Sequence, residues 1–177
     1  MIKQCCLLLL IVFIACGNPS EPEVDGISRG FFAGEVGTLN AGGLYEKLGG
    51  PATFTYSPDD SVITISLIST LLSDSTMTEV TFFIRSEGRI SAGTYPFMET
   101  TTMGAQSANG FTGVYVSPEI SDGIYYSESG TMEITHSAVD TIEGIFDLKI
   151  FTEVSTGPDT NSKSYTTLTG VFNAIEQ

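Results

Sequence analysis

The chain has 177 residues, with 21 Asp and Glu against seven Lys and Arg, for a formal net charge of −14 at pH 7. So acidic a surface is repelled by phosphate groups, and no cluster of Lys or Arg offsets the repulsion, so we exclude a nucleic-acid partner. About 150 residues remain after the N-terminal segments described next, which is enough for one hydrophobic core and too few for two ordinary domains.

Residues 1–15 have the pattern of a secretory signal. Lys3 precedes an apolar run from Cys5 to Ala15, and this run is well short of the roughly 20 residues that a membrane-spanning helix needs. It ends at Phe13-Ile14-Ala15-Cys16, which resembles the lipobox of bacterial lipoproteins, with Phe13 in place of the usual aliphatic residue. The resemblance implies lipidation of Cys16 and a membrane partner bound through acyl chains. A plain signal peptide, cut nearby to leave a free thiol at Cys16, is the alternative.

Residues 16–26 follow as a polar, acidic segment with two prolines, which predicts a flexible tether. Cys5 and Cys6 would leave with the signal, so no disulfide is expected within the mature chain. The acidic residues loosely resemble an export signal of some bacterial lipoproteins, which leaves open display on the cell surface and retention on the periplasmic side of the outer membrane. Residues 27–177 are expected to form a single all-β domain.

Beyond the tether, apolar and polar residues alternate in short runs rich in Thr, Ile, Val, Phe and Tyr. The pattern predicts an antiparallel β-sandwich of about 8–10 strands, with barrel-like closure as the alternative. Little helix is expected, because Gly42 and Gly43 limit the nearest candidate, residues 40–48, to one turn. The expected strands are residues 31–38, 51–57, 61–70, 78–86, 93–98, 111–117, 123–127, 130–136, 141–152 and 164–175.

The last two expected strands contain an internal echo, Gly144-Ile145-Phe146 and Gly170-Val171-Phe172. If their hairpin is centred near Pro158, Gly144 lies opposite Phe172 and Phe146 lies opposite Gly170. An aromatic ring over a cross-strand glycine compensates the missing side chain. We therefore interpret the echo as a packing device.

Several segments together resemble small Bacteroidota-type envelope lipoproteins with β-sandwich domains of unknown function. They are the lipobox, Pro51-Ala52-Thr53-Phe54, Gly93-Thr94-Tyr95, Ser129-Gly130-Thr131-Met132-Glu133-Ile134-Thr135 and Gly170-Val171-Phe172-Asn173-Ala174. The resemblance implies a fold and a location in the cell envelope, and it brings no catalytic residues with it.

Residues for catalysis or metal binding are sparse. The single histidine, His136, would have to serve any catalytic triad, and we interpret it as a strand-end residue. One histidine without cysteine cannot form a zinc site, so neither a cofactor nor a metal is expected. Calcium stays open at the oxygen-rich turns Asp59-Asp60 and Asp159-Thr160-Asn161-Ser162, although Lys163 follows where an EF-hand-like loop would place a ligand.

Three tripeptides resemble the short O-glycosylation sequon of some Bacteroidota: Asp60-Ser61-Val62, Asp74-Ser75-Thr76 and Asp140-Thr141-Ile142. A turn aspartate before a β-branched strand start produces the same pattern. Both interpretations stay open.

The leading hypothesis is a non-enzymatic envelope module that binds a partner protein or a glycan, or that has a structural role. A carboxylate-dependent hydrolase of envelope or extracellular polymers is the alternative, and a carrier of hydrophobic molecules would need a large apolar cavity. Asp122, Tyr125 and Tyr126 are the candidate ligand-binding residues, because adjacent tyrosines point to opposite faces of a strand. Packing in the core or at an edge is the other interpretation of these tyrosines, and the chain has no Trp for stacking on sugars.

Overall fold

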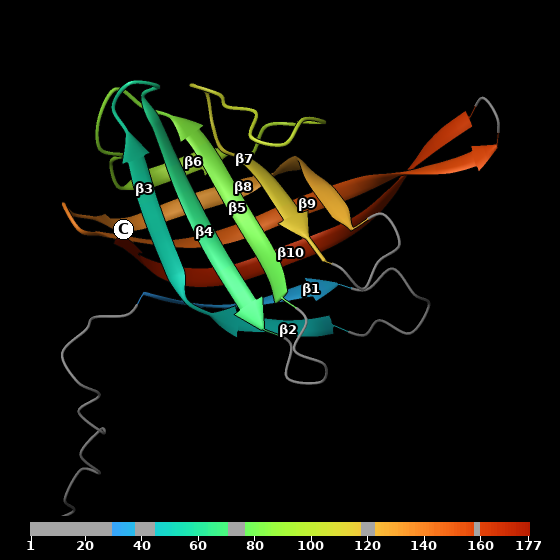
Figure 1. The fold of residues 1–177 in the computed structure, drawn as a ribbon, viewed down its shortest axis with the longest axis horizontal. Coiled ribbons are helices and arrows are strands. Elements are labelled where there is room, and N and C mark those ends of the chain that lie inside the picture. Colours follow the sequence, from blue (N-terminus) through green and yellow to red (C-terminus); the bar gives the residue numbers. More distant parts are fainter. Residues whose placement is uncertain (1–29, 38–44, 71–76, 118–122, 158–159) are drawn as a thin grey trace, which may run out of the picture.

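The computed structural model describes residues 30–37, 45–70, 77–117, 123–157 and 160–177. Several features predicted from the sequence lie outside these residues: the signal and tether, the tripeptide at residues 74–76, Asp122, Pro158 and Asp159. Within the described part of the chain, no helix is long and apolar enough to span a membrane. The described residues form ten strands (Figure 1): β1 (Phe31–Gly37), β2 (Tyr45–Gly50), β3 (Ala52–Ser57), β4 (Val62–Thr70), β5 (Met77–Arg85), β6 (Gly93–Pro96), β7 (Thr112–Val116), β8 (Ile124–Ser137), β9 (Thr141–Gly157) and β10 (Thr160–Glu176).

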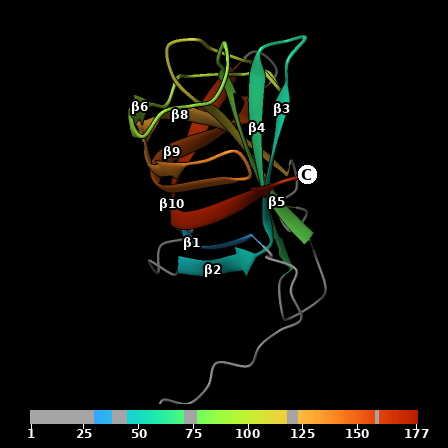
Figure 2. The same cartoon turned by 90° about the vertical axis from the view of Figure 1, so that its left-hand side faces the viewer.

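Seven of these strands close into a barrel in the order β3-β4-β5-β7-β8-β9-β10. Neighbours pair antiparallel except at the closure, where β10 pairs parallel with β3 through Ile175 opposite Thr53 and Glu176 opposite Phe54. In Figure 2, β3, β4 and β5 form one wall and β8, β9 and β10 form the wall facing it. Strands β1 and β2 extend the sheet from β10, and β6 pairs with β8. The all-β prediction is confirmed, and the structure has the barrel-like closure.

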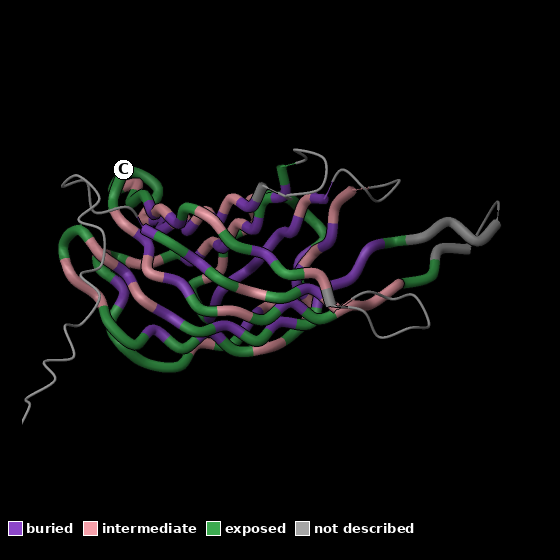
Figure 3. The backbone as a smooth tube through the Cα atoms, turned by 90° about the horizontal axis from the view of Figure 1, so that it is seen from below, coloured by how far each residue is buried: buried purple, intermediate pink, exposed green. Residues whose placement is uncertain are grey.

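The core lies between the two walls, and buried residues alternate with more exposed ones along strands such as β5 and β9 (Figure 3). Phe82 of β5 is fully buried and contacts Phe146 of β9 edge-on, with ring centroids 5.0 Å apart. Burial of such rings stabilises the fold through loss of apolar surface from water. The wall formed by β8, β9 and β10 therefore has one face in the core and one outer face.

The predicted glycine and aromatic pairing is confirmed. Gly144 lies opposite Phe172 and Gly170 opposite Phe146 in the β9–β10 register. A Cβ atom added at Gly170 would lie 2.6 Å from the Phe146 ring, and one at Gly144 would lie 2.7 Å from the Phe172 ring. Each ring therefore occupies the space that a side chain at the opposite position would need.

The strands differ from the prediction at β2 and β8, and the last hairpin is longer than predicted, since β9 continues to Gly157 and β10 begins at Thr160. No strand was predicted for residues 45–50, which form β2 because they pair with the free edge of β1, where Lys47 lies opposite Glu35. The segments 123–127 and 130–136 are one strand, β8, with an irregularity of register between Ser127 and Ser129. A bulge of this kind interrupts the alternation without ending the strand, so the sequence pattern suggests two strands.

Candidate functional site

The two candidate tyrosines lie on opposite faces of β8, as expected for adjacent strand residues. Tyr125 is 4% exposed and contacts the ring of Tyr115 on β7, with centroids 5.9 Å apart. Burial raises the pKa of the Tyr125 hydroxyl. Tyr125 is therefore a core residue, whereas Tyr126 is half-buried on the outer face. Asp122, the third candidate, lies outside the described residues.

Tyr126 begins a row of three aromatic rings across the outer face. It lies opposite Phe151 of β9, which lies opposite Tyr165 of β10. The ring centroids of Tyr126 and Phe151 are 6.3 Å apart, and those of Phe151 and Tyr165 are 6.2 Å apart. Phe151 has 0% exposure although it belongs to the outer face. Other groups must therefore cover it.

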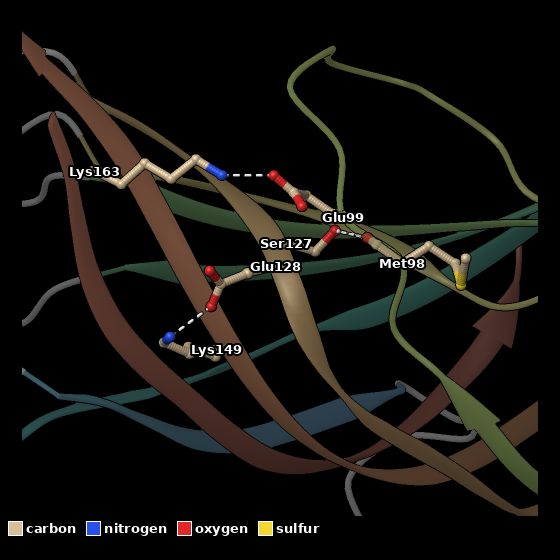
Figure 4. Close-up of polar contacts among 6 residues, drawn as sticks. All are labelled: Met98, Glu99, Ser127, Glu128, Lys149 and Lys163. Atoms are coloured by element: carbon tan, nitrogen blue, oxygen red, sulfur yellow. Dashed lines mark hydrogen bonds and ion pairs between the residues drawn. The ribbon is translucent and has the colours of Figure 1, made fainter. Parts of the chain in front are cut away.

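One cover of Phe151 is the ammonium group of Lys163, whose Nζ lies 4.0 Å from the centre of the ring. The same Nζ is 2.5 Å from the carboxylate of Glu99, and this hydrogen bond raises the pKa of Lys163. A cation held over an aromatic face is attracted by the electron density of the ring. Lys163 of β10 thus contacts both the ring on β9 and the segment that follows β6, and Figure 4 shows its contact with Glu99 of that segment.

The segment after β6 is fixed to the barrel by hydrogen bonds of the Ser127 hydroxyl and of the Ser127 carbonyl. The Ser127 hydroxyl donates to the carbonyl of Met98 at 2.7 Å, and the backbone N–H of Thr100 donates to the carbonyl of Ser127 at 3.0 Å. Glu99 lies between Met98 and Thr100 in the chain, and Figure 4 shows it beside the contact of Met98 with Ser127. Its carboxylate is therefore positioned before it meets Lys163.

A second lysine repeats this arrangement two residues before Phe151. Lys149 Nζ lies 4.0 Å from the centre of the Tyr165 ring. It is also 2.6 Å from a carboxylate oxygen of Glu128, as Figure 4 shows. The hydrogen bond from Lys149, followed by one from Tyr165, lowers the pKa of Glu128. Glu128 is the residue at which the register of β8 shifts. The bulge therefore directs a carboxylate toward Lys149.

Lys149 also lines a shallow groove of ≈ 390 Å³ on this face, which we call the outer groove. Its other lining residues are Ser129, Gly130, Thr131, Asp147, Tyr165, Thr166 and Thr167. Gly130 has φ of +142°, and a Cβ there would lie 2.1 Å from the carbonyl oxygen of Asp147. Only glycine fits this close approach of β8 to β9. The groove offers hydroxyls, one carboxylate and one ammonium group to a ligand.

The other described candidates from the sequence do not line the outer groove. His136 is exposed near the end of β8, opposite Glu143, in agreement with its interpretation as a strand-end residue. Asp60 lies in an exposed turn and accepts a hydrogen bond from the Ser57 hydroxyl at 3.0 Å. In the described part of the chain, no three His, Cys, Asp or Glu side chains are grouped to hold a metal ion. The buried polar side chains of that part are all Ser or Thr.

Comparison with known proteins adds no further constraint: no family, no curated protein and no solved structure matches this chain. Lys149, Phe151 and Tyr165 were not predicted as site residues from the sequence. The signal for them was present, however, because the register that pairs Phe146 with Gly170 also pairs Phe151 with Tyr165 five residues further along the hairpin.

Proposed function

We propose that the protein is a lipid-anchored module of the bacterial cell envelope that binds a glycan without chemical turnover, through the outer groove. The observation that favours this function is the lining of the groove. Exposed hydroxyls of Ser129, Thr131 and Thr167 surround Lys149 and Asp147. An ammonium group donates hydrogen bonds and a carboxylate accepts them, which is the complement that sugar hydroxyls require.

The position of Lys149 supports binding because its ammonium group is already oriented. Its ion pair with Glu128 and its contact with the Tyr165 ring restrict the side chain before a ligand arrives. A side chain ordered in advance loses less conformational entropy on binding. Since Lys149 covers one face of Tyr165, the proposal relies on hydrogen bonds to hydroxyls rather than on a sugar ring stacked on that face.

The charge of the protein narrows the ligand to a neutral glycan. With 21 acidic and seven basic residues, the chain repels sulfated or uronic polymers. The glycan in this proposal belongs to the envelope, since the lipobox-like Phe13-Ile14-Ala15-Cys16 suggests a lipid anchor in the outer membrane. The resemblance to small Bacteroidota-type lipoproteins agrees with this location. Palmitate labelling tests the anchor, because Cys16→Ala should abolish the label.

Binding is tested with the full chain in lipid nanodiscs on an array of neutral and anionic glycans. Saturable binding to a neutral glycan is expected, and Lys149→Ala should weaken it about tenfold, the effect of losing a hydrogen bond from a charged donor. Lys47→Ala is the matched control, since Lys47 is exposed on β2 outside the groove. Equal binding by both variants would contradict the proposal. Reproducible turnover of a bound glycan would favour the carboxylate-dependent hydrolase instead.

A further inference from the structure

A second hollow, of ≈ 310 Å³, lies where the closure of the barrel ends, and we call it the barrel mouth. Strand β10 pairs with β3 only as far as Phe54, and the N–H of Gln177 donates to the Phe54 carbonyl at 3.1 Å. Tyr56, further along β3, therefore lies beyond the paired part of the closure. The barrel mouth opens beside Tyr56 and the turn from Ala138 to Val139, which connects β8 to β9.

The interior of the barrel mouth is apolar. Phe54, Ile63, Ile90 and Ile142 line it, and all four side chains are buried. They come from β3, β4, the segment between β5 and β6, and β9, so the hollow reaches the core between the two walls. Its rim is partly apolar as well, because Val139 is 60% exposed there. An apolar chain inserted here would exchange contact with water for contact with the core.

The polar groups of the barrel mouth lie at its rim. Arg89 follows β5, and Glu176 ends β10, with β3 and β4 between those two strands in the sheet. Neither of the two ion pairs found among the described residues involves Arg89. In a chain with three acidic residues for each basic one, a guanidinium group at an apolar opening makes that opening locally favourable for an anion.

We propose that the barrel mouth binds a small amphipathic carboxylate, with its alkyl chain against Ile63, Ile90 and Ile142 and its head group on Arg89. The guanidinium fork matches a carboxylate with two parallel hydrogen bonds. The volume is at the small end of the range for ligand sites, about 300 to 1,000 Å³, which selects a short chain over a whole phospholipid. Glu176 disfavours a head group on the β10 side, so the carboxylate lies on the Arg89 side.

The three isoleucines make the proposal testable in the full chain. Isoleucine δ1 methyl groups labelled with ¹³C report on each site separately when the protein, in lipid nanodiscs, is titrated with octanoate, octanol or octylammonium. Saturable shift changes are expected at Ile63, Ile90 and Ile142 with octanoate. Ile65 and Ile150 are buried residues outside the lining of the barrel mouth and should not respond. Arg89→Gln should weaken octanoate binding about tenfold.

Arg85→Gln is the matched control, because Arg85 is also exposed at the end of β5, where it donates to Gln106 away from the hollow. Octanol should bind more weakly than octanoate and should be insensitive to Arg89→Gln. Chemical-shift changes at all isoleucines, or an absence of saturable changes, would overturn the site. Octanoate and octanol bound equally, or octanoate binding unchanged in Arg89→Gln, would overturn the assignment of the head group. These outcomes are independent of glycan binding at the outer groove.

Discussion

The two halves of the β9–β10 hairpin are held together in different ways. Near the barrel closure, Phe146 and Phe172 turn inward and fill the space over Gly170 and Gly144. Further along the same hairpin, Phe151 lies on the outer face under Lys163 and beside Tyr165. The same β9–β10 register positions the rings of both halves. The inner half depends on burial between two walls, while the outer half depends on cations and carboxylates that stay in contact with water.

A buried ring therefore need not belong to the main core. Phe151 and Phe146 are both almost fully buried, but Phe146 is enclosed by packed side chains of both walls. Phe151 is covered by a partly exposed lysine and by neighbouring tyrosines. Replacement of the Phe146 ring should therefore lower the stability of the fold more than replacement of the Phe151 ring.

Phe146→Ala is expected to give the largest effect. Loss of this ring leaves a cavity beside Phe82 and uncovers Gly170, and large-to-small changes of a buried Phe lower the free energy of unfolding by about 3 to 5 kcal/mol. Chemical denaturation of the protein and the variant measures the difference. Ile145→Ala serves as a control on the adjacent outward position, since Ile145 is exposed. Equal effects of the two substitutions would contradict the assignment of faces.

Phe151→Ala should lower the free energy of unfolding less, by about 2 to 3 kcal/mol, because its flexible cover can settle into part of the space. The same variant should also release Lys163 and Glu99, which meet above the ring. Denaturation curves give the magnitude, and NMR signals of residues 98–100 report on the release. A destabilisation as large as that of Phe146→Ala would mean that the outer ring is as rigidly enclosed as the inner one.

The sequence predicted the inner half of the hairpin better than the outer half. Gly144 and Gly170 are unusual in a strand, and the repeated spacing to Phe146 and Phe172 fixed the register in advance. Alternation of apolar and polar residues likewise located every described strand except β2, although it divided β8 in two and made β9 and β10 too short. Such local patterns arise from burial on one face of each strand, so they are visible without the structure.

The contacts of Phe151, Lys163 and Glu99 on the outer face were not predicted, because these residues come from distant parts of the chain. Lys163 meets Glu99, 64 residues away, and their contact requires the segment after β6 to be fixed by Ser127. Local sequence patterns do not reveal the closure of the barrel either. The parallel pairing of β10 with β3 consists of only two residue pairs and has no local signature. The burial of Tyr125 was not predicted either, since alternation alone does not say which of two adjacent tyrosines faces inward.

Glu99→Gln should lower the free energy of unfolding by less than about 1 kcal/mol, since both partners of this ion pair are partly exposed. The effect should shrink further when denaturation is repeated in about 1 M NaCl, which screens exposed charges. Glu87→Gln is the matched control, because Glu87 is exposed in the loop after β5. An effect that persists unchanged in high salt would show that the contact with Lys163 acts through packing rather than charge.

The smallest expected effect is a pH dependence that originates at Glu128. Hydrogen bonds from Lys149 and Tyr165 lower its pKa below the ordinary value of 4.5 in the folded protein, whereas the unfolded chain retains that value. The unfolded state then binds more protons in this range, so the contribution of Glu128 is present above pH 4.5 and is lost as the pH falls through the lowered pKa. Denaturation of the protein and of Glu128→Gln between neutral and acid pH isolates this contribution.

The difference in stability between the protein and Glu128→Gln should decrease on acidification, because Glu128 becomes neutral like the glutamine that replaces it. A difference that stays constant to the acid limit would show that the carboxylate is not held by Lys149 in solution, and would remove the reason to regard that lysine as oriented before a glycan binds.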